Sequence, residues 1–165
     1  MHTDRARVAG TVLVLCIAMG CGYRAGFVAR DDIRTVSVPV FANDTFYRHI
    51  ETDLTGAVID EIGKVTPYRI ARSNAADAVL EGRIVQYRTA LLVEDAADEV
   101  IESEILLSVE VTLRDGATGS ILAQALIRES ESFSPALGEE ELAGRPALFR
   151  RVARLVVERT FEETW

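Results

Sequence analysis

The sequence predicts one α+β domain in which two amphipathic helices pack on one face of a four-stranded, mostly antiparallel sheet. Apolar residues recur at helical spacing twice, over residues 50–65 and 146–161. Between these helices, over residues 77–127, apolar and polar residues alternate as they do in strands. With a first short strand at residues 33–41, the element order is β-α-β-β-β-α, which is typical of a two-layer sandwich.

The first predicted strand, residues 33–41, alternates between apolar and polar side chains. Pro39 favours a sheet edge or a strand end, because proline cannot donate to a ladder. A helix follows, with Asp44 or Thr45 as its candidate N-cap and Thr66 before a proline as its end. The apolar face of this helix consists of Ile50, Leu54, Ala57, Val58, Ile62 and Val65.

A short extended piece and a loop at residues 68–76 lead into the long strands. The stretch 77–93 changes the phase of its apolar alternation, which indicates a β-bulge near Ile84 and Val85. The cleanest alternation, at residues 101–113, predicts a sheet with one buried and one wet face. The inner residues of this strand are Ile101, Ile105, Leu107, Val109, Val111 and Leu113.

Residues 115–119 have the composition of a hairpin connection, and a further strand follows them. Its predicted inner residues are Ile121, Ala123, Ala125 and Ile127. Leu122 and Leu126 fall on the outer face, where they are either incidental or part of a contact surface. Pro146 fits the first turn of the second helix, where a missing N–H costs nothing. The apolar face of that helix consists of Leu148, Phe149, Val152, Ala153, Leu155, Val156, Thr160 and Phe161.

Residues 1–20 have the pattern of an export signal that is removed. A charged start precedes twelve residues, 8–19, that are nearly all apolar and too few for the roughly 20 of a membrane-spanning helix. The run Ala18-Met19-Gly20-Cys21 resembles a bacterial lipobox, so we expect Cys21 to be lipidated and to begin the mature chain. An uncleaved anchor and an ordinary signal peptide are the alternatives. Residues 21–32 are then a lipid-anchored segment, and residues 33–165 form a single domain.

The composition argues against several classes of function. The net charge of the chain is −8, and removing residues 1–20 leaves 16 basic and 25 acidic residues, a net charge of −9. Such a domain is a poor binder of nucleic-acid phosphates and has no polybasic run for a membrane surface. After maturation the chain keeps one histidine, His49, and no free thiol, so the sequence predicts no enzyme, no metal site and no cofactor.

Several stretches in order resemble the LPS-assembly lipoprotein LptE family. Gly22-Tyr23 follows the lipobox cysteine directly. The other matching stretches are Ile33-Arg34-Thr35-Val36-Ser37-Val38-Pro39-Val40-Phe41-Ala42-Asn43-Asp44-Thr45, Ile50-Glu51-Thr52-Asp53-Leu54-Thr55, Thr66-Pro67-Tyr68-Arg69 and Ala76-Asp77-Ala78-Val79-Leu80-Glu81-Gly82. The C-terminal helix that ends in Trp165 is also similar to that group. This resemblance covers nearly the whole mature chain.

The resemblance implies a non-enzymatic outer-membrane lipoprotein, attached through its lipid, that faces the periplasm. It implies a partner, an LptD-type β-barrel that the protein scaffolds and partly plugs, and a role in lipopolysaccharide transport. Arg69, Arg72, Arg83 and Arg88 are the basic residues nearest the strands, and they are either lipopolysaccharide contacts or ordinary solvated charges. The opening of the domain also resembles the TolB N-terminal domain and lipoprotein activators of penicillin-binding proteins, so an interaction module of that kind is the alternative.

Overall fold

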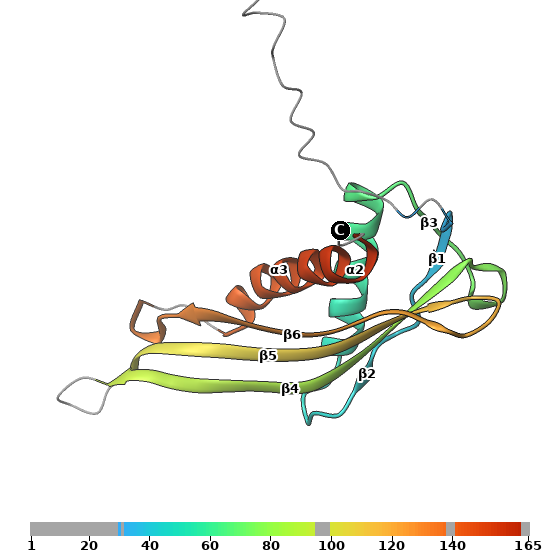
Figure 1. Ribbon diagram of the computed structural model, residues 1–165. Helices are drawn as coiled ribbons and strands as arrows, with labels where there is room; N and C mark the ends of the chain where they lie inside the picture. Colours follow the sequence, from blue (N-terminus) through green and yellow to red (C-terminus); the bar gives the residue numbers. More distant parts are fainter. Residues whose placement is uncertain (1–29, 31, 95–99, 138–140, 163–165) are drawn as a thin grey trace, which may run out of the picture.

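The computed structural model describes residues 30, 32–94, 100–137 and 141–162. Two helices, α2 (Ile50–Val65) and α3 (Glu141–Phe161), lie on one face of a six-stranded sheet (Figure 1). The strands are β1 (Thr35–Ser37), β2 (Ala42–Asn43), β3 (Arg69–Ile70), β4 (Ala78–Glu94), β5 (Val100–Asp115) and β6 (Ile121–Phe133). The α+β two-layer prediction is confirmed. Cys21, the export signal and Trp165 lie outside the described residues.

The sheet has two more strands than predicted, in the order β3-β1-β4-β5-β6 with β2 also paired to β4. The stretch 33–41 does not form one strand, because the chain leaves the ladder after Ser37 and pairs again only at Ala42. Pro39 therefore lies between β1 and β2, where its missing N–H breaks no ladder. Of the two positions expected for Pro39, a sheet edge or a strand end, the second is confirmed, because Pro39 follows the end of β1, and β1 itself lies between β3 and β4.

The two halves of the sheet differ in whether neighbouring strands are parallel or antiparallel. β1 is parallel to both β3 and β4, and β2 is parallel to β4, whereas β4, β5 and β6 form an antiparallel meander. Parallel neighbours need a long crossover, and α2 is the crossover between β1 and β3. The prediction of a mostly antiparallel sheet holds for the three long strands.

The predicted β-bulge is confirmed. The pairing of β4 with β5 shifts between Ile84 and Gln86, so that Val85 has no opposite residue in the ladder. Ile84 and Tyr87 are consequently both buried on the helix side, although they are three positions apart. In a regular strand, residues three apart point to opposite faces.

A second irregularity corrects the prediction for β6. The register shifts between Leu113 and Arg114, so that Arg114 pairs with Ile121. Ile121, expected inside, is 53% exposed, while Leu122, expected outside, packs against the core. The alternation expected for the remainder of the strand holds, since Ile127 is buried.

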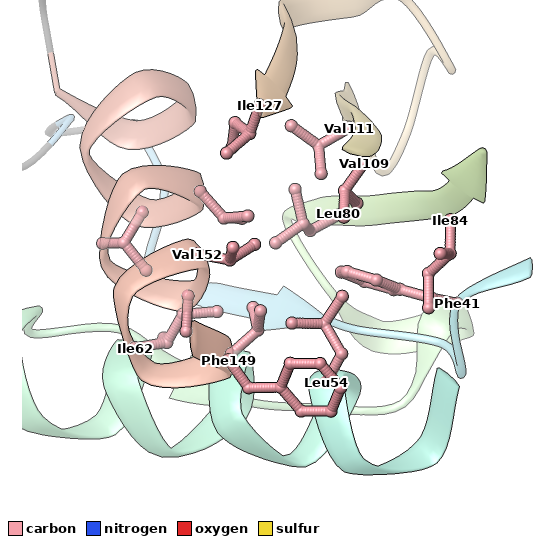
Figure 2. Packing of buried hydrophobic residues seen from close by; sticks show 14 of the residues in the cluster. Phe41, Leu54, Ile62, Leu80, Ile84, Val109, Val111, Ile127, Phe149 and Val152 are labelled. Atoms are coloured by element: carbon pink, nitrogen blue, oxygen red, sulfur yellow. The ribbon is translucent and has the colours of Figure 1, made fainter. Parts of the chain in front are cut away.

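One core lies between the sheet and the helices. Figure 2 shows side chains from α2, α3 and the long strands that point into a common space. The inner residues of β5 whose side chains the structure describes are all buried; they are Ile105, Leu107, Val109, Val111 and Leu113. The side chain of Ile101, the sixth predicted inner residue, lies outside the described part.

The predicted starts of both helices need correction. The N-cap of α2 is His49, with a φ of 68° and no side-chain cap, whereas Asp44 accepts hydrogen bonds from Arg83. The helix ends at Thr66 as predicted. Pro146 lies inside α3, which begins at Glu141, because contacts to the sheet extend the helix beyond its proline.

Candidate interaction surface

The face of the sheet opposite the helices carries no other element of the described chain (Figure 1). Its side chains are those that alternate with the buried residues of β4, β5 and β6. We call this surface the open face, and its residues are Glu81, Arg83, Gln86, Arg88, Leu106, Ser108, Glu110, Thr112, Arg114, Gln124, Leu126 and Arg128. Leu126 is 45% exposed there. Leu106 is half-buried, so the open face combines aliphatic and charged groups.

A broad groove of about 710 Å³ lies on one end of the open face. It runs between the β1–β2 connection, which contributes Pro39 and Val40, and the three long strands. Val40 is 63% exposed, and Leu126 lines the opposite side. The groove is open to solvent, and its lining includes the aliphatic side chains of Val40 and Leu126 beside charged residues.

Four arginines of the open face differ in their partners. Arg83 donates from one guanidinium nitrogen to both carboxylate oxygens of Asp44 at 3.1 Å, and Arg114 donates to Glu81 at 3.0 Å. The side chains of Arg88 and Arg128 make no hydrogen bond or ion pair within the part of the chain that the structure describes. Two cationic groups are therefore available on this face to an external partner.

The structure divides the four arginines that the sequence singled out. Arg83 and Arg88 lie on the open face together, and the β-bulge between them is the reason, since residues five apart in a regular strand point to opposite faces. Arg69 lies in β3 and Arg72 just after it, at the far edge of the sheet. The four do not form one site.

Sequence reasoning missed Arg128. It pairs with Ser108 in the ladder, and Arg88 pairs with Leu106. Both arginines thus flank the same short segment of β5 on the open face. The signal was present in the sequence, because Arg128 follows Leu126 in the outer phase of its strand.

A polar cluster on the helix side joins the start of α3 to β4. Tyr87 and Thr89 donate hydroxyl hydrogen bonds to the two carboxylate oxygens of Glu141, each at 2.8 Å. Arg145 donates to Tyr87 at 3.1 Å and to Glu141 at 3.2 Å. The ring of Tyr47 lies 4.6 Å from that of Tyr87, centre to centre. The cluster positions α3 on the sheet, and its hydrogen-bonding groups satisfy one another.

Ionisation of Glu141 is favoured by this cluster. Burial opposes the charged form, but the hydrogen bonds from Thr89, Tyr87 and Arg145, together with the charge of Arg145, outweigh it and lower the pKa. Burial and the hydrogen bond to Glu141 raise the pKa of Tyr87 to about 12, so its hydroxyl stays a donor at neutral pH. The polar cluster is therefore assembled at neutral pH.

We expect the contribution of Glu141 to stability to depend on pH. Because its pKa is lower in the folded chain, the stabilisation is complete above the ordinary carboxyl pKa, about 4.3, and is lost as pH falls through the lower folded value. Urea unfolding of wild type and Glu141→Gln should show the larger difference at pH 7 and a smaller one near pH 3.5. A difference that grows on acidification would contradict this assignment.

Within the described residues, no group of three or more His, Cys, Asp or Glu side chains is arranged to hold a metal ion. None of the helices found there is both long and apolar enough to cross a bilayer. His49 is exposed, and its backbone begins α2.

The sequence model of the LptE family, described as lipopolysaccharide-assembly, matches residues 33–160. The chain belongs to the LptE family. The match extends from just before β1 to the last turn of α3, so the resemblance found in the sequence is confirmed. No curated protein matches the sequence of this LptE-family chain.

Solved structures with the same fold come from several bacteria. The hypothetical protein CT253 from Chlamydia trachomatis is 13% identical, with a TM-score of 0.56 over 77% of this chain and 95% of that one. Lipoprotein GNA1162 from Neisseria meningitidis is 12% identical, with a TM-score of 0.52 over 76% and 99%. A point variant of the PelC dodecamer from Paraburkholderia phytofirmans is 17% identical, with a TM-score of 0.51 over 80% and 95%. At these identities the likeness establishes the fold of this LptE-family member alone.

Proposed function

We propose that this LptE-family protein is an outer-membrane lipoprotein that scaffolds and plugs an LptD-type β-barrel during lipopolysaccharide transport. The observation that carries the proposal is the family match over residues 33–160, which includes all the strands and nearly all of both helices. The role is one of interaction, not catalysis. It calls for a stable domain with an accessible surface, and the two-layer fold leaves one sheet face uncovered.

The anchor belongs to the same proposal. Residues 1–20 are removed, Cys21 carries the fatty acyl groups, palmitate among them, and residues 21–32 connect the lipid to the domain. One acyl chain binds a membrane only marginally, so stable attachment needs more than one. The domain then faces the periplasm from the inner side of the outer membrane. Mass spectrometry of the mature N-terminus should find Cys21 modified, and Cys21→Ala should abolish that modification.

The open face is the surface that we propose for the barrel contact. It is the uncovered side of the sheet, it carries exposed aliphatic residues, and Arg88 and Arg128 have no partner within the described chain. Arg83 is held by Asp44 and is a weaker candidate than Arg88 for any contact with lipopolysaccharide phosphates. Arg69 and Arg72 lie at the β3 edge of the sheet, not on the long strands that carry Arg88 and Arg128.

We expect Arg88→Glu/Arg128→Glu to weaken co-purification with the LptD-type barrel roughly tenfold or more, because reversed charges in an interface repel and lose their partners. The matched control is Arg150→Glu/Arg159→Glu on α3, which changes the net charge equally and also involves exposed residues. Quantitative affinity purification of the tagged protein measures both.

Three outcomes separate the possibilities. Loss of the barrel from the first variant but not the second supports the open face. Equal retention by both variants moves the contact to another surface. Recovery of wild type with a peptidoglycan synthase and no barrel would favour the alternative role, that of an interaction module resembling the TolB N-terminal domain.

A further inference from the structure

One edge of the sheet brings together basic residues that are distant in sequence. β3 is the edge strand and pairs with β1, where the backbone N–H of Arg69 donates to the carbonyl of Arg34 at 3.0 Å. Arg72 begins the short 3₁₀ turn after β3, and Ser73 of that turn is 3.0 Å from Ser37, hydroxyl to hydroxyl. We call Arg34, Arg69 and Arg72 the basic edge.

The guanidinium groups of the basic edge are exposed and have no hydrogen bond or ion pair to any residue that the structure describes. Six other described arginines are paired with carboxylates; they are Arg30, Arg83, Arg114, Arg145, Arg151 and Arg154. The remaining described arginines, Arg48, Arg88, Arg128, Arg150 and Arg159, are unpaired like those of the basic edge, but they lie elsewhere on the domain. Charges that stay unpaired among 26 acidic residues are available to an external anion.

Three carboxylates near this edge accept hydrogen bonds or form an ion pair within the described chain. Asp77 accepts hydrogen bonds from the backbone N–H groups of Arg34 and Thr35 and from the Thr35 hydroxyl, at 2.9 to 3.0 Å. Asp115 accepts three hydrogen bonds from Ala117 and Thr118. Asp32 is 3.7 Å from the Arg30 side chain. Hydrogen bonds from the Thr35 hydroxyl and from backbone N–H groups, together with the charge of Arg34, lower the pKa of Asp77, so this carboxylate stays charged and partly offsets Arg34. Arg69 and Arg72 form no ion pair with any carboxylate that the structure describes.

The opposite end of the domain is acidic. At this end β5 carries Glu102 and Glu104, which pair with Val93 and Ala90 of β4. Figure 1 shows the hairpin of β4 and β5 at one end of the sheet and β1 with β3 at the other. β4 has 17 residues, so about 55 Å separates the ends of that strand.

The N-terminal segment joins the domain beside the basic edge. The backbone N–H of Arg30 donates to the hydroxyl of Tyr68, the residue directly before β3, at 2.7 Å. Nine peptide steps separate Cys21 from Arg30, and they span roughly 30 Å at most. A lipid on Cys21 would therefore hold the basic end near the membrane, while the acidic end can point away.

We propose that the basic edge docks on the anionic phospholipid surface of the membrane that holds the anchor, and so sets the orientation of the domain. This inference rests on the anchor at Cys21 in the proposed function. The charges at both ends favour this orientation, since headgroup phosphates attract the basic edge and repel Glu102 and Glu104 at the far end of β5.

Vesicle flotation of the full mature chain with Cys21→Ser, which carries no lipid, isolates this contribution. Binding should appear with phosphatidylcholine vesicles that contain phosphatidylglycerol, be absent with phosphatidylcholine alone, and weaken with salt. The variant Arg34→Gln/Arg69→Gln/Arg72→Gln should partition onto these vesicles roughly 100-fold less than the parent chain. Each arginine near an anionic surface contributes about fivefold, and the three factors multiply. All three side chains are exposed, so the fold should survive, as circular dichroism can verify.

Arg48→Gln/Arg150→Gln/Arg159→Gln is the matched control, with the same change in net charge on exposed residues elsewhere. It should bind nearly as well as the parent chain. Equal losses in both triple variants, no preference for phosphatidylglycerol, or binding that requires lipopolysaccharide would each overturn the proposal. No barrel is present in this assay, so its failure can be distinguished from failure of the proposed barrel complex.

Discussion

Truncation of Phe41 to alanine is expected to lower the free energy of unfolding by about 3–5 kcal/mol, the usual cost of removing a buried aromatic ring. Phe41 is 3% exposed, and its ring lies directly over Gly82 of β4. Its backbone N–H donates to the Thr55 hydroxyl of α2 at 3.0 Å, so this residue joins both layers. Urea unfolding followed by far-ultraviolet circular dichroism measures the loss.

The ring and the glycine should be coupled. A Cβ on Gly82 would lie 2.4 Å from a ring carbon of Phe41, so Gly82→Ala should also destabilise the domain. The double variant Phe41→Leu/Gly82→Ala should lose clearly less free energy of unfolding than Phe41→Leu and Gly82→Ala lose in sum, because the smaller leucine side chain makes room for the methyl group. Additive losses would show that the ring does not depend on the absence of a side chain at Gly82.

Substitution of Gly116 by alanine is expected to cost about 3 kcal/mol, at the upper end for an overpacked site. A Cβ there would lie 2.0 Å from the backbone carbonyl oxygen of Ala76, and a backbone atom cannot rotate away as a side chain can. The N–H of Gly116 also donates to the carbonyl of Asp77 at 2.7 Å, which holds the two segments together. Thermal and urea unfolding measure the loss.

Gly56 is the matched control within the same chain. It lies inside α2, and a Cβ there would meet nothing within 4 Å. Gly56→Ala should therefore stabilise the domain by about 0.5–1 kcal/mol, because alanine loses less conformational entropy in a helix. If Gly116→Ala proved as harmless as Gly56→Ala, the close approach of Ala76 would be wrong.

Local patterns predicted most of the elements correctly. The spacing of Ile50, Leu54, Val58 and Ile62 located α2, because one face of a regular helix must meet the core. The phase change at Ile84 located the β-bulge, because an extra residue exchanges the two faces of a strand. These signals lie within a few residues of the features that they predict.

The predictions were wrong where contacts between distant segments determine which residues are buried and where a helix begins. The register shift after Leu113 turned Ile121 outward and Leu122 inward, and it depends on how β5 meets β6. Asp44 was a plausible helix cap by its position in the sequence. In the structure its carboxylate instead forms an ion pair with Arg83, which is distant in sequence. Pro146 would start an isolated helix, whereas Tyr87 and Thr89 hold an earlier start at Glu141.

The candidate surfaces, too, could be predicted from the sequence only in part, because they depend on contacts between distant segments. Arg83 and Arg88 could be selected from the sequence, but their common face and the pairing of Arg83 needed the structure. The sequence contained no polybasic run, yet the pairing of β1 with β3 brings the backbones of Arg34 and Arg69 into hydrogen-bond contact. Charges separated by many residues form a surface only when the sheet is assembled.

By itself, the sequence determined the two-layer α+β class, the order of the main elements and membership of the LptE family. Each of these follows from local periodicity or from ordered short matches, which need no knowledge of distant contacts. Only the tertiary structure decided the order of strands, the inner residues at the start of β6 and which arginines remain unpaired. The reason is physical, because pairing register and ion pairs depend on which segments meet across the sheet.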